Sequence, residues 1–389
     1  MIAKALGKKR TILHVIDALN VGGAQELLVL LAEKTPKSAY RTLVCTIQPD
    51  LTIKNRIESQ DVPVYCLNRS RPSISHPLAF ISYFYNNIKE IAAICRQQEV
   101  DVVHCHLSDA EFIGILAGRL CRTERVISTV HYPALLPERR AGDLRNYLRI
   151  AATRIIYHLA DSVIAVSDDV SEKLQTVFRL TPAKIKVIIN GIDVEKIHGT
   201  LPKPEWLSSL GALPGQRLVT AVGRLMPPKG HLHLVEALPQ LISEFGNLKL
   251  LLAGDGDLRG RLEQLSQSLK VQNHVSFLGS RNDVQEILAL TEIFVLPSLS
   301  EGTSLALLEA MAAGKPIVAT DIPGNRAVLK HENNCLLIPA GNSQKLAEAI
   351  AFLLEHPLVA ASYGRKAYED VYGRFNIEQT LEQLIAIWG

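Results

Sequence analysis

No stretch of this 389-residue sequence contains the roughly 18 uninterrupted apolar residues that a membrane-spanning helix needs, so we expect no membrane span. Residues 1–10 carry a few positive charges but lack the apolar length and the cleavage site of a signal peptide. The six cysteines form no CxxC pair and have no regular spacing, which indicates reduced core thiols in a cytosolic protein.

The dinucleotide-binding fingerprint is missing as well. The predicted strand at 11–16 is followed by Gly22 and Gly23 but not by G-x-G-x-x-G, and no acidic residue follows at the expected distance. A nicotinamide dehydrogenase therefore ranks last among the functions that we consider. The two small residues could still let a diphosphate approach the backbone.

Metal-ligand patterns are incomplete. His104 and His106 alternate along one predicted strand and so share a face, but no third ligand stands at an obvious spacing, and a pair of strand-end side chains lining a cleft is the favoured interpretation. Asp255 and Asp257 precede a predicted helix at 258–270, whose N-terminus they would cap. We predict no bound metal.

The bulk composition is that of a globular protein, since 47% hydrophobic residues provide ample material for buried cores and the length predicts two or three domains. Its charge is uneven. Residues 1–200 carry 26 Lys and Arg against 20 Asp and Glu, whereas residues 201–389 carry 16 against 19. We expect the two halves to face different partners, with no nucleic acid among them.

Strand-like and helical runs alternate along the chain, which predicts an α/β fold with parallel sheets covered on both faces. The alternation stops in the Pro- and Gly-bearing segment 190–215 and then resumes. We predict two facing Rossmann-like domains, at 1–195 and 196–370, with an interdomain cleft for ligands. A C-terminal helix within 371–389 is expected to pack back on the first domain. The predicted strands are 12–16, 42–47, 62–67, 102–106, 126–130, 162–165, 185–189, 217–222, 248–253, 275–278, 293–296, 316–319 and 335–338.

Two carboxylates stand out in a segment that is otherwise apolar or small. Glu301 follows the predicted strand at 293–296, and Glu309 lies in a Leu/Ala/Met helix that ends at Gly314. A carboxylate buried in such a helix costs several kcal/mol, on the order of the penalty for an unpaired buried charge. Glu309 therefore needs a partner, and the hydroxyl groups of a ligand would serve.

A second loop is built to attract an anion. Gly223, Arg224, Lys229 and Gly230 lie between a predicted strand and a predicted helix, where backbone amides and a helix N-terminus attract negative charge. A glycine- and proline-containing loop with solvated basic residues would show the same pattern, so the loop alone decides nothing.

Taken together these residues resemble the retaining glycosyltransferases of family 4, and the resemblance spans nearly the whole chain. Its hallmark is a pair of glutamates with seven residues between them, here Glu301 and Glu309, preceded by a loop that begins with Gly223 and Arg224 and ends at Lys229. The resemblance implies the GT-B architecture, in which two Rossmann-like domains face each other.

The resemblance also implies roles for the residues of the second half. Arg224 and Lys229, with Gly223, would hold the diphosphate of a nucleotide sugar, and Glu309 would accept hydrogen bonds from the ribose. Arg281 would flank the nucleotide base. Glu301 would hold the donor sugar together with the backbone amides of Gly302, Thr303 and Ser304.

In the first half, His131 matches the family histidine that meets the donor sugar near its anomeric carbon. A lone histidine at a strand end is more often a core or surface residue, and only the family position favours a role in binding. One loop departs from the family pattern, because Gly324 is kept while a glutamate is replaced by the run Asn325-Arg326-Ala327. These residues would recognise a different sugar or hold the loop.

The activity implied is the metal-independent transfer of a sugar, with retention, from a nucleoside diphosphate sugar to a hydroxyl of a glycan or a lipid-linked acceptor. A UDP-sugar is favoured and a GDP-sugar comes next. Arg224 and Lys229 would stabilise the leaving diphosphate electrostatically. The alternatives are a sugar-nucleotide epimerase of the same architecture and a catalytically silent binding protein.

Segment 137–158 interleaves basic and apolar residues. Arg139, Arg140, Arg145 and Arg149 could form a basic surface for an anionic membrane or for a lipid-diphosphate acceptor, at the cytoplasmic side. A charged helix face packed by its apolar stripe is the alternative.

Overall fold

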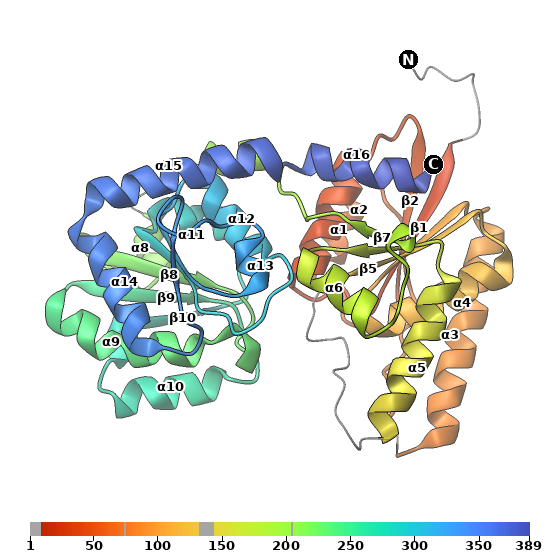
Figure 1. The fold of residues 1–389 in the computed structure, drawn as a ribbon, viewed down its shortest axis with the longest axis horizontal. Helices are drawn as coiled ribbons and strands as arrows, with labels where there is room; N and C mark the ends of the chain where they lie inside the picture. Colours follow the sequence, from red (N-terminus) through yellow and green to blue (C-terminus); the bar gives the residue numbers. More distant parts are fainter. Residues whose placement is uncertain (1–8, 74, 132–143, 204) are drawn as a thin grey trace. The chain divides into compact units, whose positions relative to one another are not determined.

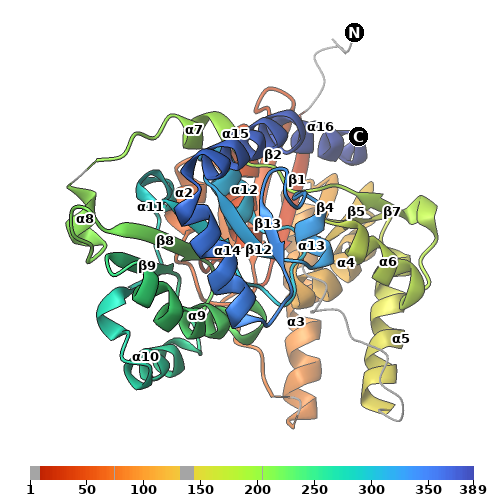
Figure 2. The same ribbon diagram turned by 60° about the vertical axis from the view of Figure 1, so that its left-hand side comes forward.

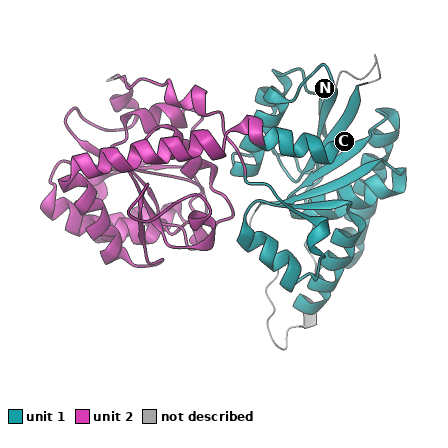
Figure 3. Cartoon of the chain, turned by 45° about the horizontal axis from the view of Figure 1, so that its top comes forward, with its two compact units in different colours: residues 1–189, 380–389 teal, residues 190–379 magenta. Residues whose placement is uncertain are grey.

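The computed structural model describes residues 9–73, 75–131, 144–203 and 205–389 and divides the chain into two compact units (Figure 3). Unit 1 comprises residues 1–189 and 380–389, and unit 2 comprises residues 190–379. The boundaries thus fall at 189/190 and 379/380, not at the 195/196 and 370/371 expected from the sequence. Ile192 explains the shift, since its amide donates to Phe375 O and its carbonyl accepts from Ile377 N, so it pairs inside unit 2.

Unit 1 is a seven-stranded, wholly parallel sheet with the order β3-β2-β1-β4-β5-β6-β7 (Figure 1). The central strands pair with His14 opposite His104 and Ile16 opposite His106. The strands are β1 (Arg10–Ile16), β2 (Tyr40–Thr46), β3 (Val64–Cys66), β4 (Val102–His106), β5 (Arg125–Val130), β6 (Ser162–Ala165) and β7 (Ile185–Val187). The helices are α1 (Gly23–Lys34), α2 (Lys54–Glu58), α3 (Pro77–Gln97), α4 (Ser108–Cys121), α5 (Leu144–Leu159) and α6 (Asp168–Thr176).

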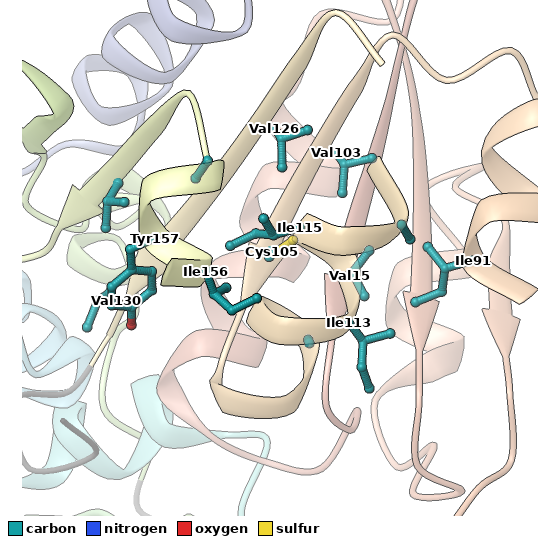
Figure 4. Packing of buried hydrophobic residues seen from close by; sticks show 14 of the residues in the cluster. Val15, Ile91, Val103, Cys105, Ile113, Ile115, Val126, Val130, Ile156 and Tyr157 are labelled. Carbon is teal, nitrogen blue, oxygen red and sulfur yellow. The ribbon is translucent and has the colours of Figure 1, made fainter. Parts of the chain in front are cut away.

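Side chains alternate between the two faces of this sheet, as the period of a β-strand requires. Val15, Val103 and Cys105 pack against Ile113 of α4 and Ile91 of α3, which cover one face (Figure 4). The other face meets α1 and α2 and, near its centre, the end of α16 (Ile377–Trp388). All six cysteines are free, and the four buried ones are Cys45, Cys95, Cys105 and Cys335.

Unit 2 repeats the architecture with a six-stranded parallel sheet of order β10-β9-β8-β11-β12-β13. Helices α9 and α14 lie side by side on one face (Figure 2). The strands are β8 (Arg217–Val222), β9 (Leu248–Ala253), β10 (Val275–Gly279), β11 (Ile293–Leu296), β12 (Ile317–Thr320) and β13 (Leu336–Ile338). The helices are α7 (Val194–His198), α8 (Trp206–Ser209), α9 (His231–Glu244), α10 (Arg259–Ser268), α11 (Val284–Leu290), α12 (Leu305–Ala312), α13 (Pro323–Arg326), α14 (Ser343–Glu355) and α15 (Pro357–Arg374).

The predicted fold class, two Rossmann-like α/β domains, is confirmed, and every predicted strand is present with its ends at most two residues from the predicted ones. The last turns of α16 pack in unit 1, where Trp388 is fully buried. Within the described residues, no single helix has both the length and the apolar composition of a membrane span. Helices α14 and α15 meet that criterion only as a pair bent by 102°.

Candidate active site

The centre of the unit 2 sheet is where a ligand site is expected. The chain runs from β8 outward through β9 and β10, then returns to the other side of β8 with β11. The loops that leave β8 and β11 therefore diverge at the carboxyl edge, which is the topological switch point at which ligands bind to sheets of this kind. Both predicted motifs follow these two strands.

The loop after β8 contains Gly223, Arg224 and Lys229 and ends at Gly230. Arg224 is exposed, while the Lys229 side chain is only 20% exposed. Gly230 has a φ of 67°, and a Cβ there would lie 2.0 Å from the Pro297 carbonyl oxygen. Only glycine fits so close an approach, and it brings the loop against the start of the β11 loop.

Lys229 and Glu301 form the central contact of this site. The Lys229 ammonium donates to Glu301 Oε1 at 2.5 Å, and the Ser298 hydroxyl donates to the same oxygen at 2.7 Å. The Glu301 side chain is only 4% exposed, so its charge is balanced by a partner from the other loop. Burial, and then the charge of Lys229, lower the pKa of His231 to about 4, which leaves His231 neutral.

Helix α12 begins beside Glu301. Ser304 is its N-cap residue and accepts a hydrogen bond from Leu307 N at 3.4 Å, and Gly302 and Thr303 are buried just before it. The first backbone amides of a helix have no partner within the helix, and together with the helix dipole they favour an anion or an oxygen ligand. Glu309 lies in the same helix and is partly exposed.

The loop after β12 is a structural support. Asn325 is fully buried and its amide donates to Thr320 O at 2.9 Å, while Arg326 pairs with Asp321 at 2.5 Å. A Cβ at Gly324 would lie 2.4 Å from the Glu301 carbonyl oxygen. Of the two interpretations offered above, these contacts favour holding the loop.

Two predicted residues have other partners. Arg281, predicted to flank the base, forms a bidentate ion pair with Asp283 at the start of α11, and its Nε lies 2.7 Å from Asp283 Oδ1. Asp255, predicted to cap a helix, pairs instead with Arg259 at 3.2 Å, and the N-cap of α10 is Leu258 with no side-chain cap. The prediction that Asp255 and Asp257 cap this helix is therefore wrong, because α10 begins at Arg259, one residue later than expected, and its N-cap position falls on Leu258.

In unit 1, Gly22 and Gly23 lie at the N-terminus of α1, after β1. Gln25 closes this loop, since its amide donates to Asn20 Oδ1 at 2.6 Å and to Ala18 O at 3.2 Å. Asp17 at the end of β1 accepts a hydrogen bond from Ala110 N at 2.7 Å. The loops after β1 and β4 are thus joined at the switch point of this sheet.

Buried acids near this point were missed by the sequence analysis. Burial raises the pKa of Asp17 to about 7, and burial also raises the pKa of Asp109, which pairs with Arg71 at 3.3 Å. Glu111 is buried under Tyr157, which donates to it at 2.8 Å, and burial raises its pKa to about 8. The one available signal was the position of Asp17 directly after a strand.

His131 follows β5 and belongs to a row of four histidines. His106 Nδ1 lies 3.0 Å from His131 Nε2, and His106 Nε2 lies 3.1 Å from His14 Nδ1. His104 contacts Thr129 Oγ1 at 2.7 Å. Burial lowers the pKa of His14 to about 3 and of His131 to about 4, and it lowers the pKa values of His104 and His106 as well, so the row is neutral.

A metal fits this row poorly. Nitrogen atoms of His14, His104 and His106 lie within 4.8 Å of one another. His104, however, has both ring nitrogens in hydrogen bonds, one with Thr129 and one with the indole of Trp388 at 3.3 Å, and its ligation would break one of them. The absence of a metal stays a prediction.

The predicted basic surface lies partly outside the described residues. Arg139 and Arg140 are not described, and neither is the side chain of Arg145. Arg149 is exposed on α5, and so are the apolar side chains of Tyr147, Leu148 and Ile155.

Comparison with known proteins agrees with these motifs. Residues 21–196 match the family model "Glycosyltransferase Family 4", and residues 202–370 match "Glycosyl transferases group 1". An uncharacterised glycosyltransferase of Methanocaldococcus jannaschii is 29% identical over 95% of this chain and 94% of its own length. The Escherichia coli UDP-Gal:alpha-D-GlcNAc-diphosphoundecaprenol alpha-1,3-galactosyltransferase is 27% identical over 98% and 97%.

Solved structures share the fold. Anabaena HepE in complex with UDP-glucose superposes with a TM-score of 0.79 at 24% identity, covering 97% of this chain and 98% of its own. A glycosyltransferase from Rickettsia africae superposes with a TM-score of 0.77 at 21% identity, covering 98% of both chains.

Proposed function

Because this chain belongs to the group 1 glycosyltransferases and has their GT-B type of fold, we propose that it transfers a sugar from a UDP-sugar to a hydroxyl of a lipid-linked or glycan acceptor, with retention. The observation that carries the proposal is the contact between Lys229 and Glu301 at the switch point of unit 2. This contact brings together a cation that would bind the diphosphate and a carboxylate that would bind the sugar. A GDP-sugar is the second choice of donor.

Lys229 and Arg224 would bind the diphosphate. The charge that builds on the leaving phosphate needs fixed positive groups, and preorganised charges act without reorganisation during the reaction. Lys229 is held by Glu301 and enclosed by its loop, whereas Arg224 is exposed and can reach a ligand. These two cations support the proposal of metal-independent transfer.

Glu301 would orient the donor sugar, and Glu309 would accept from the ribose. Glu301 already accepts from Lys229 and Ser298 through Oε1, which fixes the orientation of its carboxylate. The amides that open α12 lie in the next residues and would bind sugar hydroxyls. His131 in unit 1 would meet the sugar near the anomeric carbon, and Gly22 and Gly23 would allow the diphosphate close to the backbone.

The acceptor is proposed from the relatives. The E. coli relative acts on a diphosphoundecaprenol-linked sugar. A Campylobacter jejuni relative, 26% identical over 84% of this chain, is an N-acetylgalactosaminyltransferase whose acceptor is also a diphospho-undecaprenol-linked sugar. The exposed apolar residues of α5 beside Arg149 support peripheral contact with an anionic membrane. The free cysteines support a reducing, cytoplasmic location.

The first test is the thermal stabilisation of the protein by UDP, GDP, ADP and their sugar conjugates in the presence of EDTA. A ligand at 100 times its Kd adds about 2.7 kcal/mol to the free energy of unfolding. Stabilisation by UDP with EDTA present is expected. Stabilisation by GDP alone would mean that the donor is a GDP-sugar and not a UDP-sugar. A requirement for added Mg²⁺ would contradict metal independence.

The second test concerns the reaction. The protein is incubated with the stabilising sugar nucleotide and a synthetic lipid-diphosphate sugar, and the anomeric configuration of the product is read from its NMR coupling constants. Retention is expected. Inversion, or epimerised donor without transfer, would overturn the proposal.

A further inference from the structure

His14 within β1, His106 at the end of β4 and His131 directly after β5 form one continuous chain of hydrogen bonds. The His14 Nδ1 to His106 Nε2 distance is 3.1 Å, and the His106 Nδ1 to His131 Nε2 distance is 3.0 Å. The two terminal nitrogens, His14 Nε2 and His131 Nδ1, are buried and have no hydrogen-bond partner among the described residues. The chain therefore has two open ends.

The protons on this chain can be arranged in only two ways. A neutral imidazole carries one N–H donor and one bare acceptor nitrogen, so each ring that accepts at one nitrogen must donate at the other. The donors run either from His14 through His106 to His131 or in the reverse direction. The first arrangement leaves an N–H at His131 Nδ1, and the second leaves one at His14 Nε2.

The surroundings of the two ends distinguish the arrangements. His14 is fully buried, with the Trp388 ring nearly perpendicular to it at a centroid distance of 5.8 Å, and none of the described residues accepts a hydrogen bond from its Nε2. His131 lies at the carboxyl end of β5 and its side chain is partly exposed, although its Nδ1 is itself buried. A buried N–H without an acceptor is rarer and costlier than a bare acceptor, so the N–H belongs at the end of the histidine chain that borders the surface, where an oxygen of a bound ligand would serve as its acceptor.

We propose that His14 and His106 are positioning residues that hold His131 in its Nδ1–H form, so that His131 donates a hydrogen bond to an oxygen of the bound sugar nucleotide. This inference rests on the proposed role of His131. A histidine held in this form presents a donor and no basic nitrogen to the ligand. It therefore binds the donor substrate and does not take the proton of the acceptor hydroxyl.

His104 is fixed independently and stays outside the chain. The Trp388 indole can only donate, so His104 Nδ1 accepts and His104 Nε2–H donates to Thr129 Oγ1. Its ring centroid lies 4.3 Å from that of His106. Trp388 and His104 thus pack the histidine chain from the side without contributing protons to it.

The direct test is NMR of the full-length protein labelled with ¹⁵N-histidine at pH 7.5, where chemical shifts distinguish the two neutral forms of each ring. Comparison with His131→Ala assigns the His131 signals. Nδ1–H is expected at His131 and at His14. Nε2–H at His131, or interconversion between both forms, would overturn the inference.

Paired substitutions of His106 test its part. The amide of His106→Asn reaches the place of Nδ1 and can still donate to His131, whereas that of His106→Gln reaches the place of Nε2 and contacts only His14. We expect His131 to keep Nδ1–H in the Asn variant and to lose it in the Gln variant. The same His131 form in both variants would contradict a positioning role for His106.

Binding measurements separate this inference from the proposed function. The ratio of the Kd values for UDP and UDP-glucose isolates the sugar contact, and the Kd for UDP alone reports whether unit 2 is intact. His106→Gln should lower the affinity for UDP-glucose about tenfold and leave that for UDP unchanged, which is the size of effect expected when one hydrogen bond to the ligand is lost. If His131→Ala does not change the ratio, the proposed role of His131 fails. If it does and His131 carries Nε2–H, only the histidine chain fails.

Discussion

The two units share one strand order around their central strands, yet the side chains at their switch points differ in kind. In unit 2 the loops after β8 and β11 bring together a charged pair, Lys229 and Glu301, and leave Arg224 exposed. In unit 1 burial suppresses charge in the corresponding region, because it lowers the pKa of His14 to about 3 and raises that of Asp17 to about 7.

This difference suits two kinds of ligand group. A diphosphate is an anion and needs fixed positive charge, whereas a sugar is neutral and needs hydrogen-bond partners with defined donor and acceptor atoms. Pairing between Lys229 and Glu301 balances their opposite charges, whereas burial of His14 and Asp17 favours their neutral forms. The same topology can thus support two kinds of recognition.

The largest effect should come from Glu301→Ala. Its carboxylate is proposed to hold the sugar, so transfer should fall about 10²- to 10³-fold, the range seen when one preorganised contact to a reacting group is removed. Affinity for UDP should persist, because Lys229 remains. Transfer and UDP titration are measured beside Glu355→Ala, an exposed glutamate of α14. Equal transfer by both variants would remove Glu301 from the site.

Gly230→Ala should destabilise unit 2. The new Cβ would collide with the Pro297 carbonyl oxygen, and the φ of 67° is unfavourable for alanine, so we expect a loss of about 3 kcal/mol in the free energy of unfolding. Gly260→Ala in α10 is the matched control, since the new Cβ would meet nothing within 4 Å. This substitution should raise the free energy of unfolding by about 0.5–1 kcal/mol. Urea unfolding compares the two. Equal free energies of unfolding for the two variants would contradict the close approach of the loops that follow β8 and β11.

Lys229→Met should weaken UDP binding about 10- to 100-fold, which corresponds to the roughly 1.5–3 kcal/mol of a hydrogen bond to a charged group. Methionine keeps most of the apolar length of lysine and removes the charge. Arg261→Ala, at an exposed position of α10, removes one charge elsewhere in unit 2 and should leave the UDP affinity unchanged. Calorimetric titration measures both. Equal weakening would mean that only net charge matters.

Per pH unit, the smallest effect is the pH dependence caused by Asp17 in unit 1. Its pKa is raised from 3.8 to about 7 by burial, so between these values the unfolded chain loses the proton that the folded chain keeps. Stability then falls with rising pH by about 1.4 kcal/mol per pH unit from this group, and the effect is absent below pH 3.8. Asp17→Asn should remove this slope between pH 4 and 7 in urea unfolding, whereas the exposed Asp50→Asn should retain it.

Much of the fold could be read from the order of residues. The strand from 102 to 106 and those at 162–165, 217–222, 248–253 and 293–296 have the predicted bounds, because apolar β-rich runs bounded by turns are local signals. The exact position of the unit boundary, at 189/190 and not at the expected 195/196, could not be predicted. It depends on the pairing of Ile192 with the chain around residues 375–377, which no local pattern records.

The candidate site divides in the same way. Gly223, Arg224, Lys229, Glu301 and Glu309 were identified from their spacing, which is a property of the sequence alone. The partners of Arg281 and Asp255 were not, because more than one oppositely charged residue follows each of them in the sequence and only the loop conformation selects among these residues. Asp17 and Glu111 were missed because burial, not residue type, makes their carboxyl groups unusual.

The sequence by itself determined the family, the alternation of strands and helices, and the residues that carry charge. Only the tertiary structure decided that Lys229 pairs with Glu301, that three histidines from separate strands join in one chain, and that Trp388 reaches His104 from 284 residues away. The physical reason is that periodicity acts between near neighbours along the chain. The order and register of parallel strands, in contrast, bring distant residues to one edge of a sheet, where burial sets their protonation and their partners.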